Sequence, residues 1–291
     1  MHRLGLALAT SVLVLLPSAC RPRTPVLTVF NAAVFEPVLH DLRAAGETGM
    51  GLQIRSEAGG SGNIIRRVAE LGRQCDLMLL ADPVLFKTLG GGRFTWRIDF
   101  ASDEMALAVG IRAPFTDLAG NDWPAALLNP QTRLARADEK ISPVGARTLT
   151  VWSRREAQGF PGLRNRLLEH TGLVTDDAGS LAARLRAGDA DYAFLYRSSC
   201  LLHELRHIRL APGLRLAADG GTPDPDAISY ALSIPQAAAH QNEAEAFIRF
   251  ILDPATTLWA DKGFLTHKPR FFGSQADYAR FRDIADYGGE F

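Results

Sequence analysis

The glycine-rich stretch at residues 59–63, with the sequence GGSGN, constrains the fold more than any other part of the chain. The apolar run before it, residues 52–55, is typical of a strand. Apolar residues recur after it at helical spacing, at Ile64, Ile65, Val68 and Leu71. A strand, a glycine turn and a helix start place free backbone N–H groups at the positive end of a helix dipole. The stretch therefore predicts either a small-anion site, with Ser61 as an added donor, or a tight turn that binds no ligand.

Glycine itself has two uses in such a turn. It permits positive φ angles, and it lets a ligand approach the backbone closely. Three apolar runs around the turn predict buried strands separated by helices, at residues 26–30, 52–55 and 76–80. Strands that are apolar along their whole length are typical of a parallel sheet covered on both faces. Ligands of such sheets bind beyond the carboxyl ends of the strands. Residues 31–34 and 59–63 are expected to lie at that edge.

A second α/β unit follows the three glycines at residues 90–92. Ser142 as N-cap and Pro143 in the first helical position predict a helix start and another candidate anion site. Arg147, on the same helix, is expected either to stabilise an anion or to face solvent. Further strands are predicted at residues 105–109, 134–135, 192–196 and 228–234, and further helices at residues 163–168, 181–187, 243–252 and 255–262.

The N-terminus predicts export. Residues 4–16 form an apolar run that is short for a bilayer and typical of the h-region of a secretory signal. Residues 16–20, LPSAC, resemble the lipobox of bacterial lipoproteins, in which Cys20 is lipidated and becomes the mature N-terminus. Pro17 departs from the usual lipobox, so a conventionally cleaved signal peptide is the alternative. Cys75 and Cys200 lie in apolar runs and are expected to be buried free thiols, although export would permit a disulfide.

The charge balance excludes two classes of partner. The chain has 32 lysine and arginine residues and 32 aspartate and glutamate residues, a formal net charge of zero. A nucleic-acid-binding stripe or a basic membrane-coating face needs an excess of positive charge. We therefore expect a protein that binds neither nucleic acid nor a membrane surface through its folded part.

Six segments carry a resemblance to a known family, and they occur in the expected order: LTVFNAA (27–33), EAGGS (57–61), CDLMLLAD (75–82), SPVGAR (142–147), DYAFLY (191–196) and YALSIP (230–235). From about residue 26 to residue 264, the chain resembles the molybdate/tungstate-binding proteins of bacterial and archaeal ABC importers. The resemblance implies an α/β, two-lobed type II periplasmic-binding-protein fold. Each lobe would be a mixed sheet flanked by helices, with the ligand cleft between the lobes.

The resemblance also implies a division of the chain. Residues 1–20 would be the signal peptide with its lipobox, and residues 26–104 the first part of lobe I. Residues 105–235 would form lobe II, and residues 236–291 would be C-terminal helices that return to lobe I.

The ligand site implied by the resemblance draws on both lobes: Asn31, Ala33, Val34, Gly60, Ser61, Ser142, Val144, Gly145 and Tyr196. The family's first loop supplies a serine where this chain has Val34. Archaeal members carry acidic residues where this chain has Ser142 and Leu195, and without them an octahedral molybdate or tungstate site is not expected. A tetrahedral anion held by backbone N–H and hydroxyl groups fits better, since a carboxylate beside an anion is costly.

The function implied by the resemblance is the extracytoplasmic solute-binding component of an ABC transporter. It would be a monomer without cofactor, metal or catalytic activity. It would bind a molybdate- or tungstate-like oxyanion, or another tetrahedral anion, and pass it to a permease in the inner membrane. A ligand sensor of the same fold that does not transport is one alternative.

A zinc-dependent peptidase is the other alternative, because residues 203–207, HELRH, match the H-E-x-x-H motif. On a continuous helix, His203 and His207 would share one face as zinc ligands, with Glu204 as general base. Residues 208–213 turn strand-like at once, however, so the helix is expected to be short. The simpler interpretation is a solvated polar face.

Overall fold

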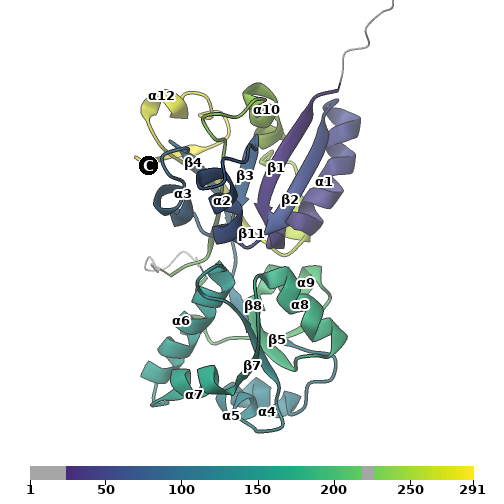
Figure 1. Ribbon diagram of the computed structural model, residues 1–291, viewed down its shortest axis with the longest axis vertical. Coiled ribbons are helices and arrows are strands. Elements are labelled where there is room, and N and C mark those ends of the chain that lie inside the picture. The colour runs from purple at the N-terminus through teal and green to yellow at the C-terminus, as the bar shows by residue number, and fades with distance from the viewer. Residues whose placement is uncertain (1–23, 218–225) are drawn as a thin grey trace, which may run out of the picture.

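Two separate sheets, each flanked by helices, form the two lobes of the computed structural model, which describes residues 24–217 and 226–291 (Figure 1). Lobe I is built on a seven-stranded sheet with the order β12-β11-β4-β10-β3-β1-β2, and lobe II on a five-stranded sheet with the order β7-β6-β8-β5-β9. The predicted two-lobed α/β fold with mixed sheets is confirmed. The proposed lipid-bearing Cys20 lies outside the described residues.

The strands of lobe I are β1 Val26–Ala32, β2 Gln53–Gly59, β3 Leu77–Leu80, β4 Arg97–Ser102, β10 Ser229–Ser233, β11 Leu265–Phe272 and β12 Asp286–Gly289. Its helices are η1 Ala33–Phe35, α1 Glu36–Gly49, α2 Ser61–Ala69, α3 Val84–Thr88, α10 Gln241–Ile251, α11 Leu258–Asp261 and α12 Gln275–Tyr278. β1 pairs in parallel with β2 and with β3, as the apolar runs predict. All four residues of β3 are buried, because helices cover both faces of a parallel sheet.

The strands of lobe II are β5 Met105–Val109, β6 Leu134–Ala137, β7 Thr171–Thr175, β8 Tyr192–Tyr196 and β9 Arg206–Arg209. Its helices are α4 Thr116–Asn121, α5 Trp123–Leu127, α6 Pro143–Ala157, α7 Leu163–His170, α8 Ala178–Ala187, α9 Arg197–Leu202 and η2 Pro212–Leu214. β5 and β8 have the bounds predicted from their apolar runs, and α6 begins at Pro143 with Ser142 as its N-cap. Within the described ranges, no helix is long and apolar enough to cross a bilayer.

Two predictions about the second half of the chain are wrong. The boundary of lobe II at residue 235 is too late, because β10 pairs antiparallel with β3 and β4 inside the sheet of lobe I. The returning segment is also not only helical, since β11 and β12 extend the same sheet. A register shift between Thr266 and Arg270 interrupts β11, so its sequence lacks the regular alternation that identifies a strand.

The chain crosses between the lobes at Asp103, directly after β4. The Asp103 carboxylate is fully buried and accepts hydrogen bonds from the hydroxyls of Ser198 and Tyr230, at 2.6 Å for Tyr230, and from the Glu104 backbone N–H at 2.7 Å. Burial raises the pKa of Asp103 to about 6. Because Tyr230 belongs to β10 and Ser198 to α9, one carboxylate joins the two lobes at the crossover.

Candidate functional site

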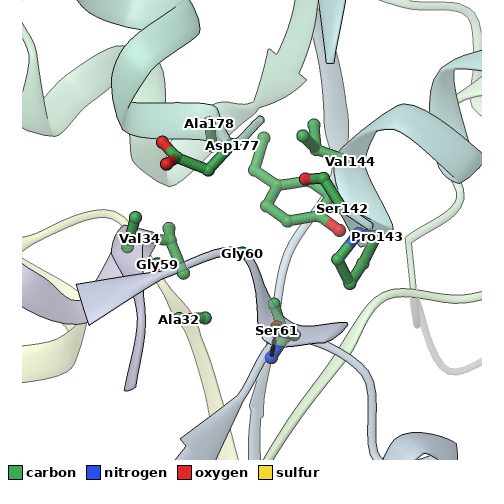
Figure 2. Close-up of a pocket in the computed structure, with 13 residues that line it drawn as sticks. Ala32, Val34, Gly59, Gly60, Ser61, Ser142, Pro143, Val144, Asp177 and Ala178 are labelled. Carbon is green, nitrogen blue, oxygen red and sulfur yellow. Dashed lines mark hydrogen bonds between the residues drawn. The ribbon is translucent and has the colours of Figure 1, made fainter. Parts of the chain in front are cut away.

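A small cavity lies between the lobes and is lined by residues from both: Ala32, Ala33, Val34, Gly59, Gly60, Ser61, Ala81, Ser142, Pro143, Val144, Asp177, Ala178 and Tyr196. Figure 2 shows Val34, Gly60 and Ser61 on one side, facing Ser142, Val144 and Ala178 on the other. Seven of the nine predicted ligand-binding residues are in this lining, and they are Ala33, Val34, Gly60, Ser61, Ser142, Val144 and Tyr196. Segments far apart in the sequence therefore meet where the resemblance places the site.

The lobe I side is formed by the ends of two neighbouring parallel strands. β1 continues into η1 with Val34 buried, and β2 ends at Gly59 beside the N-terminus of α2. Their pairing places Ala32 opposite Gly59, so both carboxyl ends open onto the same point. This is the edge of the sheet where the strand pattern predicts a ligand.

The glycines of this turn make room for the other lobe. Gly60 has a φ of −63°, so it does not need the left-handed region that glycine permits. A Cβ on Gly60 would lie 2.9 Å from the backbone oxygen of Ile141 and 3.1 Å from that of Asp176, both in lobe II. A Cβ on Gly62 would lie 3.1 Å from the Ile141 oxygen. The sequence predicts that a ligand approaches the backbone of these glycines closely. In the structure, the backbone of lobe II makes that close approach.

Ser61 supplies a hydroxyl to the floor of the cavity. Its Oγ accepts a hydrogen bond from the backbone N–H of Ala81 at 3.1 Å, and the side chain is buried. An oxygen that accepts in this way keeps its own proton free for donation. Ser61 is also the first residue of α2, whose first backbone N–H groups have no partner within the helix.

The lobe II side is formed by the start of α6. Ser142 is its N-cap and is buried, yet its side chain makes no capping hydrogen bond. Pro143 follows in the first turn, where its missing N–H costs nothing. The unused capping position leaves the Ser142 hydroxyl at the cavity wall as a third side-chain donor beside Ser61 and Tyr196.

Tyr196 is the most informative residue of the lining. It ends β8 and is 2% exposed, and its Oη has no hydrogen-bond partner within the described residues. Burial is the main cause that raises the pKa of Tyr196, and the positive charge of Arg147 opposes it. The phenol is therefore a neutral donor, and a buried hydroxyl without a partner is costly. An acceptor placed in the cavity would satisfy it.

Two predicted site residues lie outside the lining. Asn31 is fully buried and its Nδ2 donates to the Ala32 carbonyl at 3.0 Å, so it supports the end of β1. Gly145 donates its backbone N–H to the Ser142 carbonyl at 3.0 Å. A Cβ on Gly145 would lie 2.6 Å from the Ala137 oxygen, within the same lobe. Both residues shape the site without facing it.

Asp177 and Ala178 line the cavity and were missed from the sequence. Asp177 is the N-cap of α8, and its Oδ1 accepts from the Ser180 backbone N–H at 2.8 Å. The sequence signal was an N-cap aspartate before a helix whose start was predicted three residues late. β7, which leads to it, is only half buried and gives no apolar run. The Asp177 carboxylate is therefore hydrogen-bonded within the first turn of its own helix. Because α8 begins at Ala178, a third helix N-terminus lies at the cavity.

The H-E-x-x-H segment does not form one helix. α9 ends at Leu202, Glu204 has a φ of 54°, and β9 begins at Arg206. His203 therefore follows the end of α9 and His207 lies in β9, which removes the geometry that a helical zinc motif requires. The described residues hold no cluster of three His, Cys, Asp or Glu side chains suited to a metal. Cys75 and Cys200 are both buried free thiols.

The chain is similar to known solute-binding proteins. A family model described as bacterial extracellular solute-binding protein matches residues 27–265. The chain is 28% identical to a solute-binding protein of Petrotoga mobilis, over 78% of this chain and 79% of that protein. It is 22% identical to the molybdate/tungstate-binding protein WtpA of Pyrococcus abyssi, over 86% and 89% of the two chains.

Two solved structures have the same fold. The periplasmic molybdate-binding protein of Azotobacter vinelandii superimposes with a TM-score of 0.68 at 18% identity, over 83% of this chain and 99% of that chain. The sulfate-binding protein SubI of Mycobacterium tuberculosis H37Rv gives a TM-score of 0.66 at 20% identity, over 92% and 94%. These similarities confirm the two-lobed architecture predicted from the sequence.

Proposed function

The chain belongs to the bacterial extracellular solute-binding proteins, and from this premise we propose that it binds a tetrahedral oxyanion in the cavity between its lobes. The observation that carries the proposal is the pair of buried hydroxyls on opposite sides of that cavity. Ser61 of lobe I has a proton free to donate, and Tyr196 of lobe II has no partner within the described part of the chain. A ligand that accepts hydrogen bonds on several sides satisfies both.

The size of the cavity favours a compact ligand. Its volume is about 20 Å³, counted as the space open to the centre of a water molecule. One water needs roughly 10–15 Å³ on this measure. The cavity is therefore little larger than one water, which excludes a sugar or a peptide and favours the most compact anions.

The electrostatics favour an anion without a formal counter-charge. α2, α6 and α8 all begin at the lining, at Ser61, Pro143 and Ala178. Helix N-termini carry a positive partial charge and unpaired N–H groups, and three of them converge here. The one carboxylate of the lining, Asp177, is held at its own helix by Ser180. The lining therefore offers an anion hydroxyl groups and helix N-termini, and its one carboxylate is already hydrogen-bonded.

Molybdate or tungstate is the ligand that we propose first, because WtpA of Pyrococcus abyssi is named for these anions and aligns over most of both chains. Sulfate is the competing tetrahedral dianion. The protein would act as a binding component without catalytic activity, delivering the anion to the permease of an ABC transporter. We also propose that Cys20 anchors it to the membrane by a lipid, which the lipobox-like residues 16–20 support.

Titration calorimetry on the purified mature protein tests the proposal with molybdate, tungstate, sulfate and phosphate. Ser61→Ala and Tyr196→Phe each remove one hydrogen bond to a charged ligand, which is worth about 10- to 150-fold in affinity. Ser153→Ala, on the exposed face of α6, and Tyr287→Phe are matched controls that should bind as the wild type does. Unchanged affinity in both cavity variants would place the ligand elsewhere.

A further inference from the structure

An ion pair joins the two lobes beside the cavity. Asp82 follows Ala81, which lines the cavity on the lobe I side, and Arg147 lies on α6, one turn beyond Ser142 and Pro143. The Arg147 Nη2 is 3.7 Å from the Asp82 Oδ2, and the two side chains are only 16% and 19% exposed. The pair therefore exists only while the lobes are close together.

The two partners differ in how well they are held. The Asp82 Oδ1 accepts a hydrogen bond from the Val84 backbone N–H at 3.1 Å, which fixes the carboxylate at the start of α3. The Arg147 Nε is buried and has no hydrogen-bond partner among the described residues. The guanidinium thus depends on Asp82 for its compensating charge, because a partly buried cation without one is costly.

The pair lies next to the cavity without forming part of its lining. Neither Asp82 nor Arg147 is among the lining residues, but both influence the pKa of Tyr196, after burial and in opposite directions. The two charges therefore act on Tyr196 in opposite directions, while their attraction acts between the lobes.

From this placement, and on the basis of the proposed function, we propose that the Asp82–Arg147 pair is an interlobe latch that sets how long the bound anion stays. Opening the cleft separates the two charges and returns both to water, so the pair stabilises only the closed state. A group that stabilises the closed, ligand-holding state raises apparent affinity by shifting that equilibrium. The effect should appear mainly in the dissociation rate.

The test uses Asp82→Asn, Arg147→Gln and the double variant, with molybdate as the probe, measured by calorimetry and stopped-flow release. Each single variant should raise the dissociation constant by about 5- to 30-fold, mostly through faster release. The double variant should lose no more than the worse single variant, because the two residues act as one unit. Losses that multiply would instead show Arg147 acting on the anion and overturn the latch.

Arg97→Gln and Asp99→Asn are the matched controls. This pair lies within β4 of lobe I, with side chains 18% and 15% exposed and a separation of 2.9 Å. Burial and charge are close to those of the latch, but no lobe movement separates the partners. The control variants should leave the release rate unchanged. If the control variants changed the release rate as much as Asp82→Asn does, the cause would be lost stability of the fold and not the loss of the latch.

Small-angle X-ray scattering separates this proposal from the proposed function. Without added anion, Asp82→Asn should have a larger radius of gyration than the wild type, because its open state is more populated. If the wild type binds none of the four anions, the proposed function fails, but this comparison still decides the latch. The latch would be overturned if wild type and variant had the same radius of gyration and, where an anion binds, the same dissociation rate.

Discussion

At the glycine turn of lobe I, the missing side chain of Gly60 admits the backbone of the opposite lobe. At the start of α6 in lobe II, the missing side chain of Gly145 admits the backbone of its own lobe, at Ala137 and Asp138. Both turns lead into a helix whose N-terminus reaches the same cavity. Gly60 therefore lies at the contact between the lobes, whereas Gly145 lies at a contact inside lobe II. Substitution of each should therefore damage a different property.

The largest effect is expected from Gly145→Ala. The added Cβ would lie 2.6 Å from the Ala137 oxygen and from the Asp138 carbonyl carbon, which are backbone atoms that cannot turn aside. Overpacking of this kind should lower the free energy of unfolding by about 3 kcal/mol. Denaturant unfolding measures this directly. A stable Gly145→Ala protein with weakened binding would mean that Gly145, like Gly60, affects ligand binding and not the stability of the fold.

Asp103, at the crossover between the lobes, makes the stability of the fold depend on pH. Its pKa is raised from 3.8 to about 6 by burial, so the folded state holds a proton that the unfolded state releases. Stability from this group is therefore present below about pH 4 and is lost as the pH rises to about 6. The loss amounts to about 2–3 kcal/mol.

Asp103→Asn isolates this effect, because asparagine mimics the protonated acid. The free energy of unfolding of wild type minus that of the variant should fall between pH 4 and pH 6.5, as measured by denaturant titration at several pH values. The cavity hydroxyls do not titrate in this range, since the pKa of Tyr196 is raised further above its ordinary value. A difference that stays constant with pH would show that Asp103 is ionised throughout.

Gly60→Ala should give the smallest change in free energy, and it should appear in binding. The new Cβ would meet the Ile141 oxygen at 2.9 Å only when the lobes are closed, so they would have to stop short of full contact. We expect affinity to fall by about 30-fold, roughly 2 kcal/mol, with the melting temperature of the ligand-free protein unchanged. Calorimetry measures the affinity, and thermal unfolding of the same sample measures the melting temperature. If Gly60→Ala lowered stability as much as affinity, Gly60 and Gly145 would not differ in the property that they support.

Much of the lining was predictable because its parts are local. Ser61 and Ser142 stand at helix starts that the neighbouring residues specify, and Tyr196 ends an apolar strand. Asp177 was missed because β7 before it alternates between exposed and buried residues, which hides the strand-to-helix junction. The resemblance implied Asn31 and Gly145 as site residues, but the Asn31 amide nitrogen and the Gly145 backbone N–H donate to carbonyls inside their own lobes.

Most helix and strand starts were predictable from the sequence, because capping residues and apolar runs act over a few positions along the chain. The sequence also determined the family and the order of the segments. The three-dimensional structure was needed to show what the glycines face, that β10 belongs to lobe I, and that Arg147 pairs with Asp82. These contacts join residues whose separation in the chain carries no local signal. The contacts of Gly60 and Arg147 form where the two lobes meet, and the pairing of β10 forms where the chain returns to the sheet of lobe I.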